Sequence, residues 1–232
     1  MRVLGLIPAR GGSKSVPGKN IAPLAGRPLL TYTVAAAAAA TRLDRVILST
    51  DDEGIAEVGR AAGVEVPFLR PAALADDAAP TLGVVRHALD FLEAEEDDCP
   101  DAVCLLQPTA PLREGRHIDE AIALLITEDA DSVVSVCPVP HQYHAGFSFK
   151  IEAGRLAPFL ADGLRYTRRQ DLPELFTRNG AIYVTRRAVI RGGSLYGERC
   201  LPYRMAPEVS VNIDSPLDFL LAEALLTQRA GT

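Results

Sequence analysis

The segment VLGLIP, which occupies Val3–Pro8, runs directly into the segment ARGGSKSVPGKN at residues 9–20. The first segment is a short apolar run closed by a proline, which is typical of a buried β-strand. The second is polar and rich in glycine, so it predicts a loop at the end of that strand. Residues 27–40 then predict a helix that ends in a run of six alanines, because alanine is the strongest helix former. A strand, a loop and a helix in this order form the first unit of an α/β fold.

The same alternation continues along the chain to residue 137. Apolar runs predict further strands, and apolar residues at helical spacing predict the helices between them: strands at 45–50, 64–69, 102–106 and 131–137, and helices at 53–62, 81–94 and 116–127. Crossovers of this length require parallel pairing, and right-handed connections place helices on both faces of the sheet. We therefore expect a three-layer α/β sandwich around a mainly parallel sheet. In such folds ligands bind beyond the carboxyl ends of the strands, which here means residues 9–20, 50–52 and 107–113.

The alternation stops at Pro138. Residues 140–178 mix aromatic and charged residues with turn signals, and they predict a small β-rich excursion from the main sheet. The chain then returns with predicted strands at 180–185 and 209–213 and a closing helix at 215–228. We expect one domain over residues 1–232, with the excursion inside it.

Composition excludes several classes of protein. The 232 residues are 48% hydrophobic and 23% charged, which is ordinary for a globular domain and argues against disorder or a fibrous repeat. The net charge of −6 is opposite to that of most proteins that bind long nucleic acids through phosphate contacts. The four cysteines show neither zinc-ligand spacing nor a disulfide framework, no signal peptide is evident, and no apolar run is long enough to span a membrane. We expect a soluble, cytoplasmic protein without a nucleic-acid or membrane partner.

The glycine-rich loop has the features of an anion site. Gly11 and Gly12 allow a tight turn whose backbone N–H groups can point at an anion. Arg10, Lys14 and Lys19 add three cations within ten residues, a density of positive charge that suits a triphosphate. The loop matches neither a Walker A motif nor G-x-G-x-x-G. The alternative interpretation is an ordinary basic surface loop.

Several segments in order along the chain resemble the CMP-N-acylneuraminate (sialic-acid-type) cytidylyltransferase family. They are IPARGGSK at 7–14, PGKNI at 17–21, STDD at 49–52, RP at 70–71 with LADD at 74–77, QPTAPLR at 107–113, RNGAIY at 178–183 and NIDSPLDF at 212–219. The resemblance implies a nucleotide-diphospho-sugar transferase-like fold. It also implies transfer of CMP from CTP to the anomeric hydroxyl of a nonulosonic (sialic-acid-like) sugar, with release of pyrophosphate. The implied partners are CTP, an acidic sugar and a second copy of the chain, with residues 140–178 as the dimerisation excursion.

The resemblance also assigns roles to individual residues of this sequence. The catalytic residues it implies are Arg10, Lys19 and Asp214. The CTP-binding residues it implies are Ala9, Arg10, Gly11, Gly12, Ser13, Lys14, Lys19, Asn20, Arg70 and Thr81, and the sugar-binding residues are Gln107, Thr109, Arg169 and Tyr183. For Gln107 the alternative is a plain turn at the end of a strand.

The charge of CTP calls for a divalent cation, most naturally Mg²⁺. The resemblance assigns its binding to Asp214, with Asn212 where many relatives have a second Asp. An asparagine carbonyl can ligate a cation without adding charge, so a second tightly held metal is disfavoured. The alternative for Asp214 is helix capping, because Ser215-Pro216-Leu217-Asp218 resembles a capping box with proline at its first helical position. We assign Asp218 to the helix start.

The segment VPHQYHA at residues 139–145 departs from the family on the side that recognises the sugar, because it lacks the lysine that relatives place there. We expect His141 and His144 to be polar residues of a partner interface or of the sugar site rather than metal ligands. Two other functions stay open. One is CMP transfer to another acid, such as 3-deoxy-manno-octulosonate or a phosphonate. The other is a non-catalytic nucleotide-binding relative, which Asn212 favours and which Arg10, Lys19 and Asp214 oppose.

Overall fold

The computed structural model describes residues 1–12, 16–76, 79–161, 163–166 and 168–230. Its centre is a six-stranded sheet with strand order β10-β6-β9-β5-β1-β4. The strands are β1 (Val3–Pro8), β4 (Arg45–Ser49), β5 (Ala102–Leu105), β6 (Ser132–Pro138), β9 (Phe176–Arg186) and β10 (Cys200–Arg204). β1 pairs in parallel with β4 and β5, β10 pairs in parallel with β6, and β9 is antiparallel to both of its neighbours. The prediction of an α/β fold around a mainly parallel sheet is confirmed.

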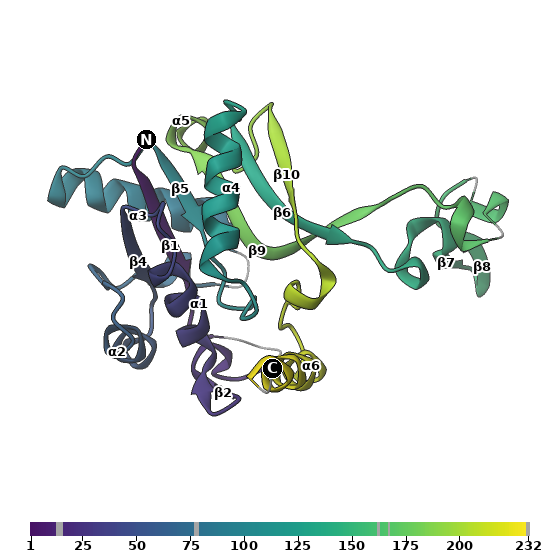
Figure 1. Cartoon of the computed structure of the whole chain (residues 1–232), viewed down its shortest axis with the longest axis horizontal. Helices are drawn as coiled ribbons and strands as arrows, with labels where there is room; N and C mark the ends of the chain where they lie inside the picture. Colours follow the sequence, from purple (N-terminus) through teal and green to yellow (C-terminus); the bar gives the residue numbers. More distant parts are fainter. Residues whose placement is uncertain (13–15, 77–78, 162, 167, 231–232) are drawn as a thin grey trace.

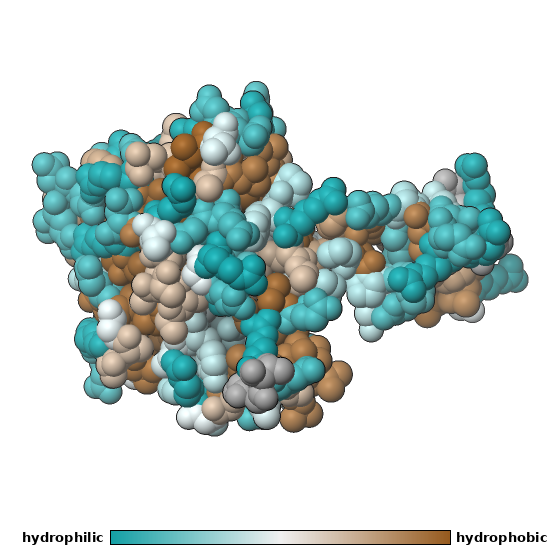
Figure 2. Space-filling view, in the orientation of Figure 1, coloured by the Kyte–Doolittle hydropathy of each residue, from teal (hydrophilic) through white to brown (hydrophobic). Residues whose placement is uncertain are grey.

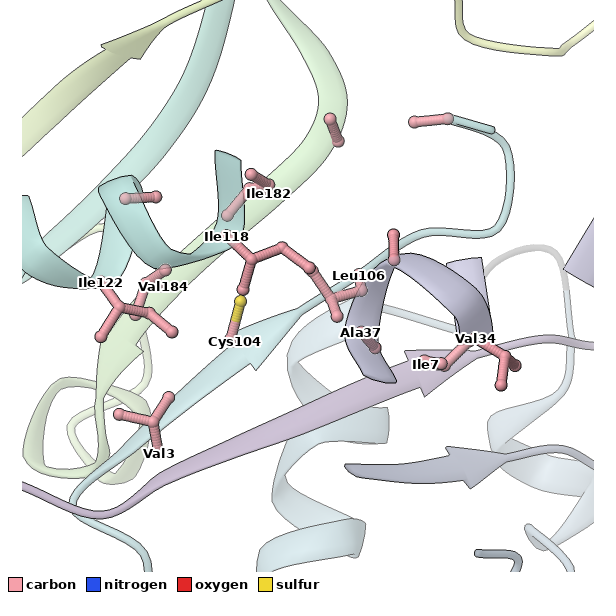
Figure 3. Packing of buried hydrophobic residues seen from close by; sticks show 14 of the residues in the cluster. Val3, Ile7, Val34, Ala37, Cys104, Leu106, Ile118, Ile122, Ile182 and Val184 are labelled. Atoms are coloured by element: carbon pink, nitrogen blue, oxygen red, sulfur yellow. The ribbon is translucent and has the colours of Figure 1, made fainter. Parts of the chain in front are cut away.

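Helices cover both faces of this sheet (Figure 1). The helices of the structure are α1 (Leu29–Ala38), α2 (Glu53–Ala61), α3 (Thr81–Glu96), α4 (Gly115–Thr127), α5 (Arg187–Arg191) and α6 (Pro216–Ala230). Successive residues of β1 alternate between two cores. Val3 and Ile7 pack with α1 and α4, as Figure 3 shows, whereas Leu4 and Leu6 pack with α3 and α5. Because both faces of the strand are buried, its sequence is an unbroken apolar run.

The excursion leaves the body between β6 and β9 and projects well away from the sheet (Figure 1). Its described residues include an antiparallel hairpin, β7 (Phe149–Glu152) with β8 (Arg155–Pro158). The remaining short elements of the excursion are 3-10 turns at His141–Tyr143, Ala145–Phe147, Gly163–Arg165 and Arg169–Asp171.

The shorter elements near the N-terminus shape the approach to the sheet edge. They are the 3-10 turn Lys19–Ile21, the small hairpin of β2 (Pro23–Leu24) with β3 (Arg27–Pro28), and the 3-10 turn Ala72–Leu74. α6 packs on this hairpin, since Ile213 and Ala222 share a buried cluster with Leu24 and Leu29. Within the described ranges, no helix combines the length and hydrophobicity that a bilayer-spanning segment needs.

Two of the predicted strands are wrong. Residues 64–69 run beside β4 but make only isolated bridges, Ile47 with Glu65 and Thr50 with Leu69. Pro67 removes a backbone donor inside this segment, which prevents a continuous ladder. In the predicted strand 209–213, Val209 ends the 3-10 turn Pro207–Val209 and residues 210–213 are irregular chain; the edge strand is β10 instead. β10 contains Pro202, which an edge strand tolerates because one of its sides carries no partner.

Candidate active site

A cavity of about 410 Å³ lies beyond the carboxyl ends of β1 and β5, where the fold rule predicts a ligand site. Most of the residues that the sequence singled out line it together: Arg10, Lys19, Asn20, Arg70, Thr81, Gln107, Thr109, Asn212 and Asp214. These residues come from both ends of the chain. The convergence is a product of the fold, since no local segment contains more than a few of them.

The glycine-rich loop is fixed by its neighbours on β4 and α2. Ala9 is buried, and its N–H donates to the carbonyl of Ser49 at 3.0 Å. The N–H of Gly11 donates to the Asp51 carboxylate at 3.2 Å. A Cβ at Gly11 would lie 2.7 Å from the Asp52 carboxylate and 3.0 Å from its Cβ, so a larger residue at this position would displace the Asp52 side chain. Gly12 has open space around it, and the predicted Ser13 and Lys14 lie outside the described residues.

Lys19 and Asp214 join the two ends of the chain inside the cavity. The Lys19 ammonium is largely buried and donates to the carbonyl of Ile213 at 2.8 Å and to Asp214 Oδ1 at 3.3 Å. Asn212 Nδ2 donates to the second carboxylate oxygen of Asp214 at 2.5 Å. Both oxygens of Asp214 are therefore held by groups of the site.

Asp218, and not Asp214, serves the start of α6. Its carboxylate accepts hydrogen bonds from the N–H groups of Asp214 at 3.0 Å and Ser215 at 2.7 Å, and from the Ser215 hydroxyl at 2.8 Å. Burial raises the pKa of Asp218, but these hydrogen bonds outweigh it and leave the pKa lowered. The assignment of Asp218 to the helix start is consistent with this geometry. The Asp214 side chain is 69% exposed and faces the cavity.

Arg70 places a second buried cation at the cavity. It is 5% exposed, and its Nη2 donates to Asp51 at 3.4 Å. Burial lowers its pKa, and the Asp51 charge opposes that shift. Arg70 Nε is buried without a hydrogen-bond partner among the described residues. Asp51 thus orients both Arg70 and Gly11. Asp51 belongs to the segment 50–52 that the carboxyl-end rule marks as a ligand edge, but the sequence alone assigns no individual role to it.

A second cavity of about 320 Å³ adjoins the first and shares Thr81, Gln107 and Asn212 with it. Arg178, Tyr183 and Tyr196 line its other walls, so the predicted Tyr183 lies here. Burial raises the pKa of the Tyr183 hydroxyl, and the nearby Arg178 opposes the shift. Gly180 lies in the wall between the cavities, with a backbone φ of +73°.

Asn212 offers an oxygen at this shared wall. Its Oδ1 is buried and has no hydrogen-bond partner in the described part of the chain. In the structure Asn212 Nδ2 faces the Asp214 carboxylate. Rotation of the amide would place Oδ1 beside that carboxylate as a second hard oxygen donor, which would suit Mg²⁺. No group of three or more His, Cys, Asp or Glu side chains gathers as a metal site anywhere in the described ranges.

Arg113 supports the site through buried hydrogen bonds to the chain that lines it. Its side chain is almost fully buried and donates to the carbonyls of Gln107 at 3.2 Å and Ala181 at 2.6 Å, and to Thr33 Oγ1 at 2.7 Å. Burial lowers its pKa to about 10. The guanidinium thereby ties the Gln107 loop to β9 and α1. The sequence showed Arg113 inside a motif but gave no signal of this supporting role.

Arg169 lies apart from both cavities in this chain. It lines a groove at the base of the excursion with His141, His144 and Leu172. His144 is buried, accepts from the N–H of Gly146 at Nδ1 (2.9 Å) and contacts the carbonyl of Pro173 through Nε2 at 3.0 Å. His144 therefore stabilises the fold of the excursion itself, and its expected role at a partner interface or in the sugar site stays a prediction.

Comparison with known proteins identifies the family. A family model described as cytidylyltransferase matches residues 4–225. The chain belongs to this cytidylyltransferase family. This chain is 35% identical over 230 residues to the CMP-N,N'-diacetyllegionaminic acid synthase of Legionella pneumophila, and the match covers 97% of each chain. It is 34% identical over 223 residues to the N-acylneuraminate cytidylyltransferase of Streptococcus agalactiae, where it covers 95% of itself and about half (52%) of that longer chain.

Two further proteins are similar to this chain, one in sequence and one in structure. The pseudaminic acid cytidylyltransferase of Campylobacter jejuni is 30% identical over 227 residues, with 97% of this chain and 96% of that one covered. The solved structure of CMP:2-keto-3-deoxy-manno-octonic acid synthetase complexed with CTP superposes with a TM-score of 0.74 at 17% identity, over 99% of this chain and all of that one. At this identity the superposition shows a shared fold. The match thus supports the nucleotide-diphospho-sugar transferase-like architecture.

Proposed function

We propose that this cytidylyltransferase transfers CMP from CTP to the anomeric hydroxyl of a nonulosonic acid and releases pyrophosphate. The observation that carries the proposal is the pair of adjoining cavities at the carboxyl edge of the sheet. The larger has cations from Arg10, Lys19 and Arg70 on its walls, and the smaller has the polar groups of Tyr183 and Arg178. A transfer between two substrates needs both of them bound side by side. Here one cavity suits an anionic nucleotide, the other suits a polar acceptor, and the two share a wall.

At phosphorus the proposed reaction forms one P–O bond and breaks another. The anomeric oxygen attacks the α-phosphorus of CTP and its proton passes to solvent, while the bond from that phosphorus to the bridging oxygen of the β-phosphate breaks. Pyrophosphate leaves with the electron pair. Chemistry of this kind depends on positioning and charge stabilisation. Arg10, Lys19 and Arg70 would stabilise the triphosphate and the departing pyrophosphate, with Ala9, Gly11, Gly12 and Asn20 shaping the loop and Thr81 completing the nucleotide wall.

Mg²⁺ is the cofactor of the proposal, and Asp214 with Asn212 would hold it. A bound divalent cation neutralises phosphate charge and stabilises the leaving group. Support comes from two groups on the same cavity wall: the Asn212 oxygen, which has no hydrogen-bond partner among the described residues, and the exposed Asp214 carboxylate. Gln107, on the wall that the two cavities share, and Thr109, on the wall of the larger cavity, follow β5 and would bond the acceptor hydroxyls.

A cytoplasmic homodimer is the assembly that we propose. The excursion exposes a set of large apolar side chains that an isolated chain leaves in water: Tyr143, Phe149, Ile151, Leu156, Phe159 and Leu164. Such a patch is typical of a protein interface. In a dimer built on the excursion, Arg169 would lie at the interface and could serve the partner's acceptor site.

The test is a panel of acids incubated with CTP, with and without Mg²⁺. The panel contains an N-acylneuraminate, N,N'-diacetyllegionaminate, pseudaminate, 3-deoxy-manno-octulosonate and a phosphonate. Pyrophosphate release and mass spectrometry of the CMP conjugate are the readouts. We expect conjugates with at least one nonulosonic acid. Conjugates with octulosonate or the phosphonate alone would transfer the function to those acids, and CTP binding without any conjugate would support a non-catalytic relative.

A further inference from the structure

Arg178 lies on β9 immediately before Asn179 and Gly180, at the mouth of the smaller cavity. The pairing of β9 with β6 is irregular beside this point, between Val134 and Val136 of β6. The irregularity and the positive φ of Gly180 interrupt the regular alternation of side chains along the strand. Arg178 is exposed on the wall of this cavity.

The partner of the Arg178 guanidinium is a neutral phenol. Its Nη1 donates to the Tyr196 hydroxyl, and its central carbon lies 5.8 Å from the centre of the Tyr196 ring. Within the described ranges Arg178 has no carboxylate partner, whereas Arg186, further along the same strand, pairs with Asp129 at 2.7 Å and Arg191 pairs with Asp90 and Glu93. A guanidinium carries five N–H donors, so most of those of Arg178 remain for a ligand.

The loop that carries Tyr196 is fixed to the sheet. The Ser132 hydroxyl donates to the carbonyl of Tyr196, and Thr185 Oγ1 donates to the carbonyl of Leu195 at 2.7 Å. The N–H of Tyr196 donates to Ser194 Oγ at 3.0 Å. A rigid loop holds the phenol, and the phenol in turn orients the guanidinium. Preorganisation of this kind lowers the entropy cost of binding a ligand.

We propose that Arg178 binds the carboxylate of the acid acceptor in the smaller cavity and selects acids over neutral sugars. The proposal rests on the function proposed above and names the residue that recognises the acid. A planar guanidinium matches a planar carboxylate with two parallel hydrogen bonds. Arg178 already lies within the site of a single chain, beside Tyr183 and Gln107. Arg169, by contrast, lies in the groove at the excursion base and reaches neither cavity of its own chain.

The test measures steady-state kinetics with the acid that the wild-type enzyme turns over, using Arg178→Met and Arg178→Lys. We expect Arg178→Met to raise the KM for the acid by about 10- to 100-fold, the scale for losing hydrogen bonds to a charged group. The KM for CTP should stay within about twofold, because the nucleotide cations lie in the other cavity. Arg178→Lys should recover part of the loss. Arg60→Met is the matched control, because Arg60 is a surface arginine of α2 paired with Glu53.

The carboxamide of the same sugar and a sugar phosphate complete the test. The wild-type enzyme should discriminate strongly between acid and amide, and Arg178→Met should lose most of this discrimination. A wild-type preference for the sugar phosphate over the acid would assign Arg178 to phosphate and overturn the proposal, as would an unchanged acid KM in a folded Arg178→Met variant. If the wild-type enzyme forms no CMP conjugate with any acid, the proposed function itself fails and this assignment fails with it.

Discussion

Gly180 is the position at which a single methyl group tests whether the two cavities work as one site. Its backbone φ is +73°, and a Cβ built there would lie 2.9 Å from Gln107 Oε1 and 3.1 Å from Asn212 Oδ1. Those oxygens belong to the wall that both cavities share. Gly180→Ala therefore pushes against two residues assigned to the acceptor and the metal.

Gly26 supplies the matched control. Its φ is +77°, and a Cβ there would meet no atom within 4 Å. Both substitutions force alanine into the left-handed region, at about 1–2 kcal/mol each. For a chain of this length that corresponds to a loss of about 2–8 °C in Tm. The two atoms that Gly180→Ala displaces are the ends of side chains that can rotate, so we expect its additional stability cost to be small.

Catalysis should separate the two variants. Displacing Gln107 and Asn212 moves groups that position the substrates, and shifts of about 1 Å in such groups can lower the rate by about 100-fold. We expect Gly180→Ala to lose at least about tenfold in kcat/KM for the acid, on the same grounds. Gly26→Ala should keep the wild-type value.

The assay is pyrophosphate release at saturating CTP and varied acid, with Tm from differential scanning calorimetry for both variants. Equal losses of Tm with unequal losses of activity are the expected pattern. If Gly180→Ala and Gly26→Ala retain equal activity, the shared wall has no part in catalysis and the two-cavity interpretation is refuted.

Four other outcomes follow from the site. Lys19→Ala should lower kcat by about 100-fold or more, the scale for removing a preorganised charge, and full activity would remove the glycine-rich loop from the mechanism. Asp214→Asn should abolish activity or its Mg²⁺ dependence, whereas an unchanged metal titration would contradict its role. Asn212→Asp adds a carboxylate beside Asp214 and should tighten Mn²⁺ binding without CTP in electron paramagnetic resonance; unaltered affinity would count against a metal site here. Burial lowers the pKa of His117 below 6.5, so the unfolded chain takes up a proton that the folded chain resists, and stability should fall as pH drops below about 6.5. Urea unfolding at pH 7.5 and 5.5 should show this fall, with a smaller one in His117→Gln, and His87 shifts in the same direction.

The parts of the fold that the sequence predicted are those with both faces buried. The sequences of β1 and β5 are unbroken apolar runs because helices cover both faces of the sheet. Once these strands were assigned, the alternation of strand and helix predicted the helices between them. The segments at the edges of the sheet were predicted less well. Residues 64–69 are apolar enough for a strand but contain Pro67, and β10 is a true strand with a weaker apolar pattern. Edge strands bury less surface and tolerate proline, so the hydrophobic pattern alone does not distinguish them well from irregular chain that runs beside the sheet.

For the site, sequence reasoning succeeded where position along the sheet decides and failed where side-chain contacts decide. The carboxyl-end rule and the family motifs brought Lys19, Gln107 and Asp214 to one cavity. They could not show that Arg113 supports the Gln107 loop, because that role depends on a buried contact with β9. They also placed Arg169, and not Arg178, among the sugar-binding residues. Which arginine faces a cavity depends on the irregular stretch of β9 around Gly180, and that has no signature in the sequence apart from the glycine itself.

The contact between Lys19 and Asp214 shows how the fold separates stability from chemistry. Asp214 is exposed, and an ion pair with one exposed partner contributes little to folding. The C-terminal segment is held instead by burial of Ile213 and Ala222 against Leu24 and Leu29. Packing, and not the ion pair, fixes α6 in place. Lys19 can therefore leave Asp214 to bind a phosphate, and Asp214 can bind a cation, without loosening the fold. Packing that holds both ends of the chain while leaving these charges available brings groups 195 positions apart to one cavity.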